Sequence, residues 1–287
     1  MTENIYILLP VHNRKAVTRL FVESLQKQTY RDYTLILIDD GSTDGTSEMV
    51  AEAIAGCVVI KGGGDWWWAG ALQQGYLWLK AANIEPSSLV LIMNDDTEFA
   101  EDFLAQGASL LENREKTVLL AQCYSKQSGC LIDAGVHVDW RRFTFAQAAT
   151  PDEINCLSTR GLFLRAKDFV AIGGFYPFLL PHYGSDYEFT IRAWRLEMTL
   201  MTHPSLFLVL NEETGGYLSF AAENRRESLR RLFSCKSVHN PLVWFCFVML
   251  ACPWPWKIVN LGRISRGFVQ HVYEIFRGQA TSVPDLR

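Results

Sequence analysis

The stretch Ile36-Leu37-Ile38-Asp39-Asp40-Gly41-Ser42-Thr43-Asp44-Gly45-Thr46 decides the fold of this chain of 287 residues. An apolar strand ends in two adjacent carboxylates, and a turn rich in Gly, Ser and Thr opens a helix, for which Thr43-Asp44 supplies an N-cap. Parallel α/β sheets place ligand-binding groups at the carboxyl ends of their strands in this way. The stretch therefore predicts an α/β protein with a polar site at one edge of its sheet.

A second predicted strand ends in the same manner. Leu89–Met93 is apolar throughout and runs directly into Asn94-Asp95-Asp96. Hard divalent cations take carboxylate oxygens as ligands, so two acidic strand ends in one sheet indicate a pocket for a metal ion and a polar ligand.

Short apolar runs alternate with helical spacing through the first half of the chain. This pattern is a βαβ series, and it predicts a mainly parallel central sheet flanked by helices, with right-handed crossovers. The expected strands are Ile5–Leu9, Leu35–Asp39, Val58–Ile60, Leu89–Met93 and Val118–Ala121, and the expected helices are Val17–Gln28, Ser47–Ala55, Ala69–Ala82 and Glu101–Leu111.

The second half of the chain is less regular, but no repeat or low-complexity linker divides it. We expect short strands in Leu131–Asp139 and Thr159–Leu164, a helix over Asp186–Leu196, and further strands over Thr199–Met201 and Leu206–Leu210. One continuous domain with a divergent second half fits this pattern best.

Charge and cysteine usage narrow the function classes. The net charge of -4 combines an acidic body with a basic tail, since residues 225–287 hold ten Lys/Arg against three Asp/Glu. This asymmetry argues against nucleic acid as a partner and makes an anionic membrane surface plausible. Seven scattered cysteines without a CxxC pair indicate reduced thiols in the cytoplasm and no zinc site. The first residues show no signal-peptide pattern.

The tail itself admits three interpretations. Arg225–Phe233 is patterned as a basic amphipathic helix, whose arginines would meet phosphate groups or solvent, and Leu242–Trp256 is almost wholly apolar but contains Pro253 and Pro255. The tail could form a helical hairpin packed on the domain, attach peripherally to a membrane interface, or span the membrane. The run is short for a span, and its Trp, Pro and flanking basic residues suit the headgroup region better.

Several segments together resemble glycosyltransferase family 2, the inverting enzymes with a GT-A fold that use nucleotide-sugar donors. Leu8-Leu9-Pro10-Val11-His12-Asn13-Arg14 resembles the family's first strand and turn, and Ile38–Thr46 its most recognisable motif. Met93–Asp96 occupies the place of its Asp-x-Asp element. Gly173-Gly174-Phe175 and Gly184–Phe189 resemble its Gly-Gly-Phe and Glu-Asp-x-Asp-Leu pair. The resemblance covers roughly residues 4–215, and Gly62–Gly70 looks like a bacterial subgroup that builds surface polysaccharides.

The resemblance implies a division of the chain. Residues 1–220 would form the GT-A domain, with a nucleotide-sugar-binding half (1–122) and a half that carries the acceptor and the catalytic base (123–220). Residues 221–287 would form a helical extension that can associate with a membrane.

The resemblance also gives the acidic residues roles on the donor side. A nucleotide sugar has a diphosphate leaving group, whose charge a Mn²⁺ or Mg²⁺ ion neutralises. Asp96 is the expected metal ligand, although Asn94 departs from the family's usual first Asp. Asp95 and Asn94 would hold the ribose or orient a metal-bound water. Asp40 would accept the N–H of a uracil or thymine ring, and a simple hydrogen-bonded turn is the structural alternative.

Further donor and acceptor contacts are expected from two loops. Pro10, His12 and Arg14 should line the nucleotide cleft beside the first strand. In Gly62–Gly70, Asp65 and Trp68 are expected to contact the nucleotide sugar and Trp67 the acceptor, whereas at least one of the three consecutive tryptophans should lie in the core.

Asp186 is the expected catalytic base. Inversion at a sugar carbon needs the acceptor hydroxyl deprotonated on the face opposite the diphosphate, and general-base catalysis contributes about 10²–10⁴-fold. Ser185 replaces the family's usual Glu, and Glu188 stands at its second Asp and is expected to bind the acceptor or cap the helix. A purely structural N-cap is the alternative for Asp186. His203 is not favoured as a metal ligand.

The leading hypothesis is therefore an inverting, metal-dependent glycosyltransferase. It would move a sugar from a UDP- or dTDP-sugar to a hydroxyl of a lipid-linked or polysaccharide acceptor in bacterial cell-surface glycan synthesis, at the cytoplasmic face of the membrane. A catalytically silent nucleotide-sugar-binding subunit is the main alternative. A nucleotidyltransferase is disfavoured, because Val11–Lys15 lacks the glycine-rich loop that such enzymes use for triphosphate.

Overall fold

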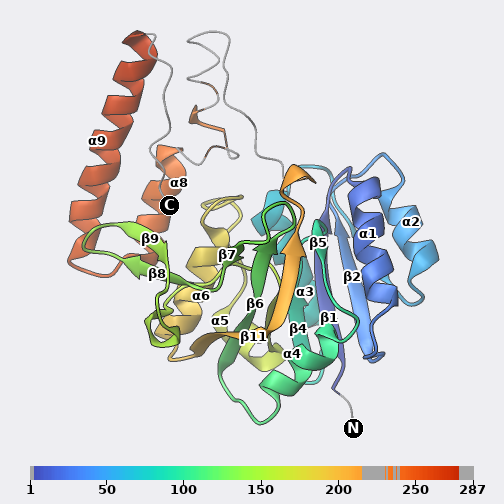
Figure 1. The fold of residues 1–287 in the computed structure, drawn as a ribbon. Coiled ribbons are helices and arrows are strands. Elements are labelled where there is room, and N and C mark those ends of the chain that lie inside the picture. The colour runs from blue at the N-terminus through green and yellow to red at the C-terminus, as the bar shows by residue number, and fades with distance from the viewer. Residues whose placement is uncertain (1–2, 215–229, 231, 235–236, 238–239, 278–287) are drawn as a thin grey trace.

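The computed structural model describes residues 3–214, 230, 232–234, 237 and 240–277 (Figure 1). A single large sheet has the strand order β3-β2-β1-β4-β10-β6-β11-β5, with β7 paired to β6, and β8 and β9 form a separate hairpin. The strands are β1 (Ile5–Val11), β2 (Tyr33–Asp39), β3 (Val58–Lys61), β4 (Leu89–Ile92), β5 (Thr97–Glu98), β6 (Thr117–Ser125), β7 (Leu131–Asp133), β8 (Val136–Asp139), β9 (Thr144–Gln147), β10 (Leu162–Arg165) and β11 (Thr199–Leu210). The α-helices are α1 (Lys15–Gln26), α2 (Thr46–Ala53), α3 (Trp67–Ala81), α4 (Phe103–Leu111), α5 (Ala166–Ile172), α6 (Ser185–Arg195), α8 (Pro241–Ala251) and α9 (Trp256–Arg277).

The expected βαβ series is confirmed in the first half of the chain. Strands β3, β2, β1 and β4 are parallel neighbours. The second half makes the sheet mixed, because β10 runs antiparallel to both β4 and β6, and β5 and β7 also pair antiparallel. Because β6 lies antiparallel to β10 and β11 lies parallel to β6, these two strands run in the same direction as the first four. The prediction of a mainly parallel sheet is therefore confirmed, with β10, β5 and β7 as its antiparallel strands.

One further prediction needs correction at β11. Thr199–Met201 and Leu206–Leu210 were expected as separate strands, but they form one strand, parallel to β6, whose register shifts between His203 and Phe207. Pro204 lies inside this irregularity, and a proline cannot donate a ladder hydrogen bond.

The sheet is buried on both faces, which explains the continuous apolar runs of its strands. Alternate residues of β1 point to opposite sides: Ile5, Ile7 and Leu9 join a core that includes Phe21 of α1 and Leu104 of α4. Leu8 joins the opposite core, beneath α3, α5 and α6.

The turns after the parallel strands lie at one edge of the sheet. The last residue of β1, Val11, pairs with Asp39 at the end of β2, and Leu8 pairs with Ile92 at the end of β4. The segments that follow these three strands therefore meet, and this edge carries Asp39, Asp40, Asp95 and Asp96.

The C-terminal apolar run Leu242–Trp256 forms α8 and ends at the first residue of α9. Helix α8 buries Val243 and Phe247 against Val138 of β8 and Ile191 of α6, in a third core. Helix α9 stands beside α8, on the side of the molecule opposite to α1 and α2 (Figure 1). Among the described residues, no helix is long and apolar enough to cross a bilayer. The helix predicted for Arg225–Phe233 falls mostly outside the described residues.

Candidate functional site

Arg14 joins the turns after β1 and β4. Its Nε atom donates to both carboxylate oxygens of Asp95, at 2.9 and 3.0 Å, and its Nη2 atom lies 3.4 Å from Oδ2 of Asp96. Thr18 of α1 donates a further hydrogen bond to Asp95, at 2.9 Å. Burial raises the pKa of Asp95, and Arg14 and Thr18 oppose that rise. Asp95 is thus a positioning carboxylate whose acceptor sites face the protein.

Asp96 differs from Asp95 because one of its oxygens is unused. Oδ1 of Asp96 is buried and has no hydrogen-bond partner among the described residues. Burying a carboxylate oxygen without a hydrogen-bond donor costs free energy. A divalent cation bound to that oxygen would offset the cost. No group of three or more His, Cys, Asp or Glu side chains that could hold a metal occurs in the described part of the chain. A cation here would take most of its remaining ligands from phosphate oxygens and water, as Mg²⁺ commonly does.

The Asp39-Asp40 pair organises the loop that precedes α3. Asp39 accepts hydrogen bonds from the Ser42 amide, at 2.8 Å, and from the Ser47 hydroxyl. Asp40 accepts from the amides of Gly64, Trp66 and Trp67, at 2.8, 2.9 and 3.1 Å. The carboxylate of Asp40 therefore caps the start of α3.

Gly41 allows this loop to approach closely. Its φ is +74°, and a Cβ atom at this position would lie 2.8 Å from the Gly64 amide nitrogen. Asp40 is 6% exposed, and its carboxylate already accepts hydrogen bonds from three backbone amides. A nucleobase would have to donate to the one acceptor site that remains. Holding the loop is the role of Asp40 that these contacts support directly.

The three tryptophans divide between core and surface, as expected. Trp66 and Trp68 are partly buried and pack against the core beneath α3, so the position of Trp68 favours packing over a ligand contact. Trp67 is 37% exposed and has a φ of +56°, and its ring lies edge-on to His182, with 6.4 Å between centroids. Of the three side chains, Trp67 is the exposed one.

His182 connects this loop to the segment that carries Asp186. The Ala69 amide donates to the Pro181 carbonyl at 3.0 Å, and the Ser185 hydroxyl lies 2.8 Å from the His182 carbonyl oxygen. The loop before α3 and the start of α6 are therefore neighbours, although they are far apart in sequence.

Asp186 lies in the first turn of α6, and the charges of Arg160 and Asp133 act on it. Burial raises the pKa of its carboxyl, and Asp133 of β7 adds to the rise, whereas Ser185 and Arg160 oppose it. Burial alone would lower the pKa of the Arg160 guanidinium, but the neighbouring Cys123, Asp96 and Asp133 raise it above its usual value. The charge of Arg160 therefore acts on the carboxyl of Asp186, and the charge of Asp96 acts on Arg160.

The expectation that Glu188 binds the acceptor needs correction. Glu188 is 3% exposed, and its two oxygens accept from Nε and Nη2 of Arg192, both at 2.9 Å. Arg192 also donates to the carbonyls of Ile172 and Gly174, each at 2.8 Å. Glu188 consequently fixes the Gly-Gly-Phe segment against α6 and has no surface to offer an acceptor.

The remaining predicted residues lie around the same edge. His12 is exposed and its Nδ1 atom bonds the Asp40 carbonyl, Asp65 is exposed in the loop before α3, and Asn94 is half-buried after β4. Pro10 is buried within β1, so its position gives no support to a direct nucleotide contact. Sequence reasoning missed Arg160 and Asp133, because only the strand order brings them to Asp96 and Asp186.

These features define an α/β protein of the GT-A type, with acidic turns at the carboxyl edge of a sheet that is parallel in its first half. Residues 6–170, more than half of the chain, match the family described as Glycosyl transferase family 2, and the chain belongs to that family. A shorter match, 41% identical over 49 residues, links it to glycosyltransferase GlyG of Streptococcus pneumoniae serotype 4. That match covers 17% of this chain and 16% of GlyG.

Solved structures confirm the fold. TarS 1–349 of S. aureus in complex with UDP-GlcNAc superposes with a TM-score of 0.63 at 14% identity, covering 99% of this chain and 95% of that one. The mannosyltransferase PcManGT of Pyrobaculum calidifontis, in complex with GDP-Man and Mn²⁺, gives 0.58 at 14% identity, with 99% and 77% covered. The chain spans 56% of a longer TarS structure. Similarity at this level of identity establishes the fold alone.

Proposed function

We propose that the protein is an inverting, metal-dependent glycosyltransferase that moves a sugar from a UDP- or dTDP-sugar to a hydroxyl of a lipid-linked or polysaccharide acceptor. Membership of glycosyl transferase family 2 supports glycosyl transfer. One observation carries the finer proposal: Asp96, with its unused oxygen, and Asp186, at the start of α6, both interact with the Arg160 guanidinium.

The donor would be held on the Asp96 side of the site. Asp96 would bind a Mn²⁺ or Mg²⁺ ion, which when bound neutralises the charge of the departing diphosphate. Arg14 holds Asp95 and Asp96 at the turn, and Asp40 holds the loop that presents Asp65 and Trp67. PcManGT binds GDP-Man with Mn²⁺, and TarS 1–349 binds UDP-GlcNAc, which supports a nucleotide sugar as the ligand class.

Asp186 would act as the general base. Its carboxylate takes the proton of the acceptor hydroxyl, the hydroxyl oxygen forms the new bond to the anomeric carbon, and the bond from that carbon to the diphosphate oxygen breaks. Attack from the face opposite the diphosphate inverts the anomeric configuration. Ser185 holds the start of α6 to the His182 carbonyl, so the base is positioned before the acceptor arrives.

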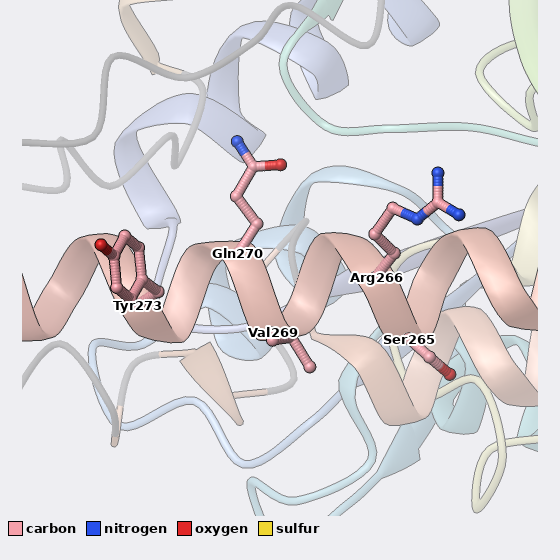
Figure 2. Close-up of a pocket in the computed structure, with 5 residues that line it drawn as sticks. All are labelled: Ser265, Arg266, Val269, Gln270 and Tyr273. Atoms are coloured by element: carbon pink, nitrogen blue, oxygen red, sulfur yellow. The ribbon is translucent and has the colours of Figure 1, made fainter.

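We further propose that the C-terminal helices contact the cytoplasmic face of a bacterial membrane, where a lipid-linked acceptor would be found in cell-surface glycan synthesis. Helix α9 exposes Ile258, Val269, Tyr273 and Phe276, each more than half exposed, beside basic residues. Figure 2 shows Arg266 and Gln270 projecting from one side of α9 and Val269 from another, around a shallow pocket. An apolar stripe edged by Arg suits a lipid headgroup interface.

Sugar transfer from a panel of UDP- and dTDP-sugars to membrane-extracted glycolipids, with Mn²⁺ or Mg²⁺, tests the proposal. We expect transfer with inverted anomeric configuration, abolished by EDTA and reduced at least 100-fold in Asp186→Asn. Donor binding without transfer or donor hydrolysis would instead identify a silent binding subunit.

A further inference from the structure

The segment before β10 carries a positively charged side chain, that of Arg160. The Gly161 amide donates to the Ile92 carbonyl and its carbonyl accepts from the Ala121 amide, so this backbone is fixed between β4 and β6. Gly161 has a φ of +79°, and a Cβ atom there would lie 2.7 Å from Leu208. Arg160 is therefore held next to the carboxyl end of β4, which Asn94 and Asp96 follow.

Arg160 is partly buried, and it makes no ion pair with any residue that the structure describes. Its Nε atom is buried and has no hydrogen-bond partner within the described residues, and its Nη1 atom has Cys123 Sγ as a weak partner at 3.9 Å. A buried guanidinium normally has a carboxylate at hydrogen-bond distance, because removing the cation from water is costly. Here Asp96 and Asp133 act on Arg160 through their charges, and Arg160 acts in the same way on Asp186.

The chemistry of the proposed reaction determines what lies between these groups. The diphosphate leaves on the Asp96 side, and the acceptor hydroxyl is deprotonated on the Asp186 side. The anomeric carbon must lie between them, and so must the sugar that it belongs to. Arg160 follows this geometry, because Gly161 fixes it beside the end of β4 and its buried Nε atom has no partner among the described residues, which leaves a donor for a sugar at that position.

The local charge indicates which sugars fit. Three carboxylates and one guanidinium leave two negative charges in excess, and a divalent cation would balance them. A donor diphosphate then restores an excess of negative charge, so a sugar with its own carboxylate is disfavoured. The hydroxyls of a neutral sugar ring, by contrast, can accept hydrogen bonds from the unused N–H groups of the guanidinium.

We propose that Arg160 is a specificity-determining residue that donates hydrogen bonds to hydroxyls of the transferred sugar, and that this sugar is neutral. The inference rests on the proposed function, because it locates the sugar between the two sites of that reaction. Ser158 and Thr159 supply two more buried hydroxyls without partners in the described structure, immediately before Arg160. The segment thus has spare polar groups at the place where a polyhydroxylated ligand would bind.

The test compares Arg160→Gln and Arg160→Lys with the native protein, and Arg142→Gln, at a side chain that is 80% exposed, is the matched control. Thermal shift with Mn²⁺ measures affinity for UDP and for UDP-glucose, UDP-galactose, UDP-N-acetylglucosamine and UDP-glucuronic acid. Transfer assays give kcat/KM ratios for the donors that react.

We expect native protein to bind one neutral nucleotide sugar more tightly than UDP, and UDP-glucuronic acid no more tightly than UDP. Arg160→Gln should reduce the preference between neutral donors about 10- to 100-fold, the range for hydrogen bonds to a charged group, and leave UDP affinity within about twofold. Arg160→Lys keeps the charge and should retain the fold.

Three results would overturn the inference: unchanged donor ratios in Arg160→Gln, tighter binding of UDP-glucuronic acid than of the neutral donors, or equal loss of UDP and UDP-sugar affinity in the folded Arg160→Lys variant. A native protein that distinguishes UDP-sugars from UDP through Arg160 but transfers none would support the inference and contradict the proposed function.

Discussion

Nε of Arg14 lies 2.9 Å from Oδ1 and 3.0 Å from Oδ2 of Asp95, so a single N–H group donates to both oxygens of the carboxylate that follows β4. Asp95 is buried and Arg14 is 28% exposed. Replacing Arg14 by Ala leaves a buried carboxylate with Thr18 as its other side-chain donor. We expect a loss of about 3 kcal/mol in unfolding free energy, the low end for breaking a buried pair.

Urea unfolding of Arg14→Ala, Asp95→Asn and the double variant measures this coupling. The double variant should be more stable than the sum of the two single losses implies. Additive losses would mean that the two side chains act independently.

The unused Oδ1 atom of Asp96 gives a separate prediction for metal dependence. Oδ1 has no donor in the described structure and Oδ2 contacts Arg14 only at 3.4 Å, so Asp96→Ala should cost little stability. It should abolish the extra thermal stabilisation that Mn²⁺ gives in the presence of UDP, and lower kcat/KM by about 100-fold or more. Asp152→Ala, at an exposed acidic position, is the control. A Mn²⁺ effect that survives in Asp96→Ala would place the cation elsewhere.

Glu188 and Arg192 provide a test of structural against substrate-binding roles. Glu188→Gln removes the charge from a buried pair that also holds the Ile172 and Gly174 carbonyls through Arg192. We expect a loss of about 3 kcal/mol in unfolding free energy and an unchanged KM for the acceptor in the protein that remains folded. Glu52→Gln, at an exposed position, should change neither. A raised acceptor KM without destabilisation would restore the acceptor role predicted from the sequence.

The sequence was most informative where its signals are local. The strand and turn from Ile36 to Thr46 specify their own structure, because apolar residues end at a carboxylate pair and Gly41 permits the close approach of Gly64. The role of Glu188 was only partly predictable in this way: its i,i+4 spacing to Arg192 favours an ion pair, but the contacts of Arg192 with the Ile172 and Gly174 carbonyls depend on tertiary structure. Arg160 gave no local signal at all. Its position depends on β10 inserting between β4 and β6, which is a property of the strand order.

The exposed face of α9 predicts binding to anionic lipid. Val269 is 66% exposed, and Arg266 and Arg277 are exposed on the same helix. Val269→Glu places a carboxylate in the apolar stripe and should weaken binding to phosphatidylglycerol vesicles about tenfold or more in a flotation assay. Gln270→Glu makes the same charge change on the neighbouring polar side and should weaken binding less. Equal effects of the two variants would indicate that net charge alone drives attachment.

Asp186 should show opposite pH effects on activity and on stability. Burial raises the pKa of its carboxyl above the ordinary aspartate value. A general base works when ionised, so kcat/KM should fall as the pH decreases through that raised pKa. The native state also binds this proton more tightly than the unfolded state does, so the contribution of Asp186 to stability is present at low pH and is lost as the pH rises through the folded pKa.

Asp186→Asn cannot ionise, so it should melt at a higher temperature than native protein at neutral pH, and this difference should vanish in acid. The same variant should lose about 10²–10⁴-fold in kcat/KM. Melting curves and initial rates across the pH range measure both effects on one pair of proteins. A variant that is less stable at neutral pH, or that retains activity, would show that Asp186 has a structural role in the first turn of α6, because losing such a residue destabilises the fold without removing a base.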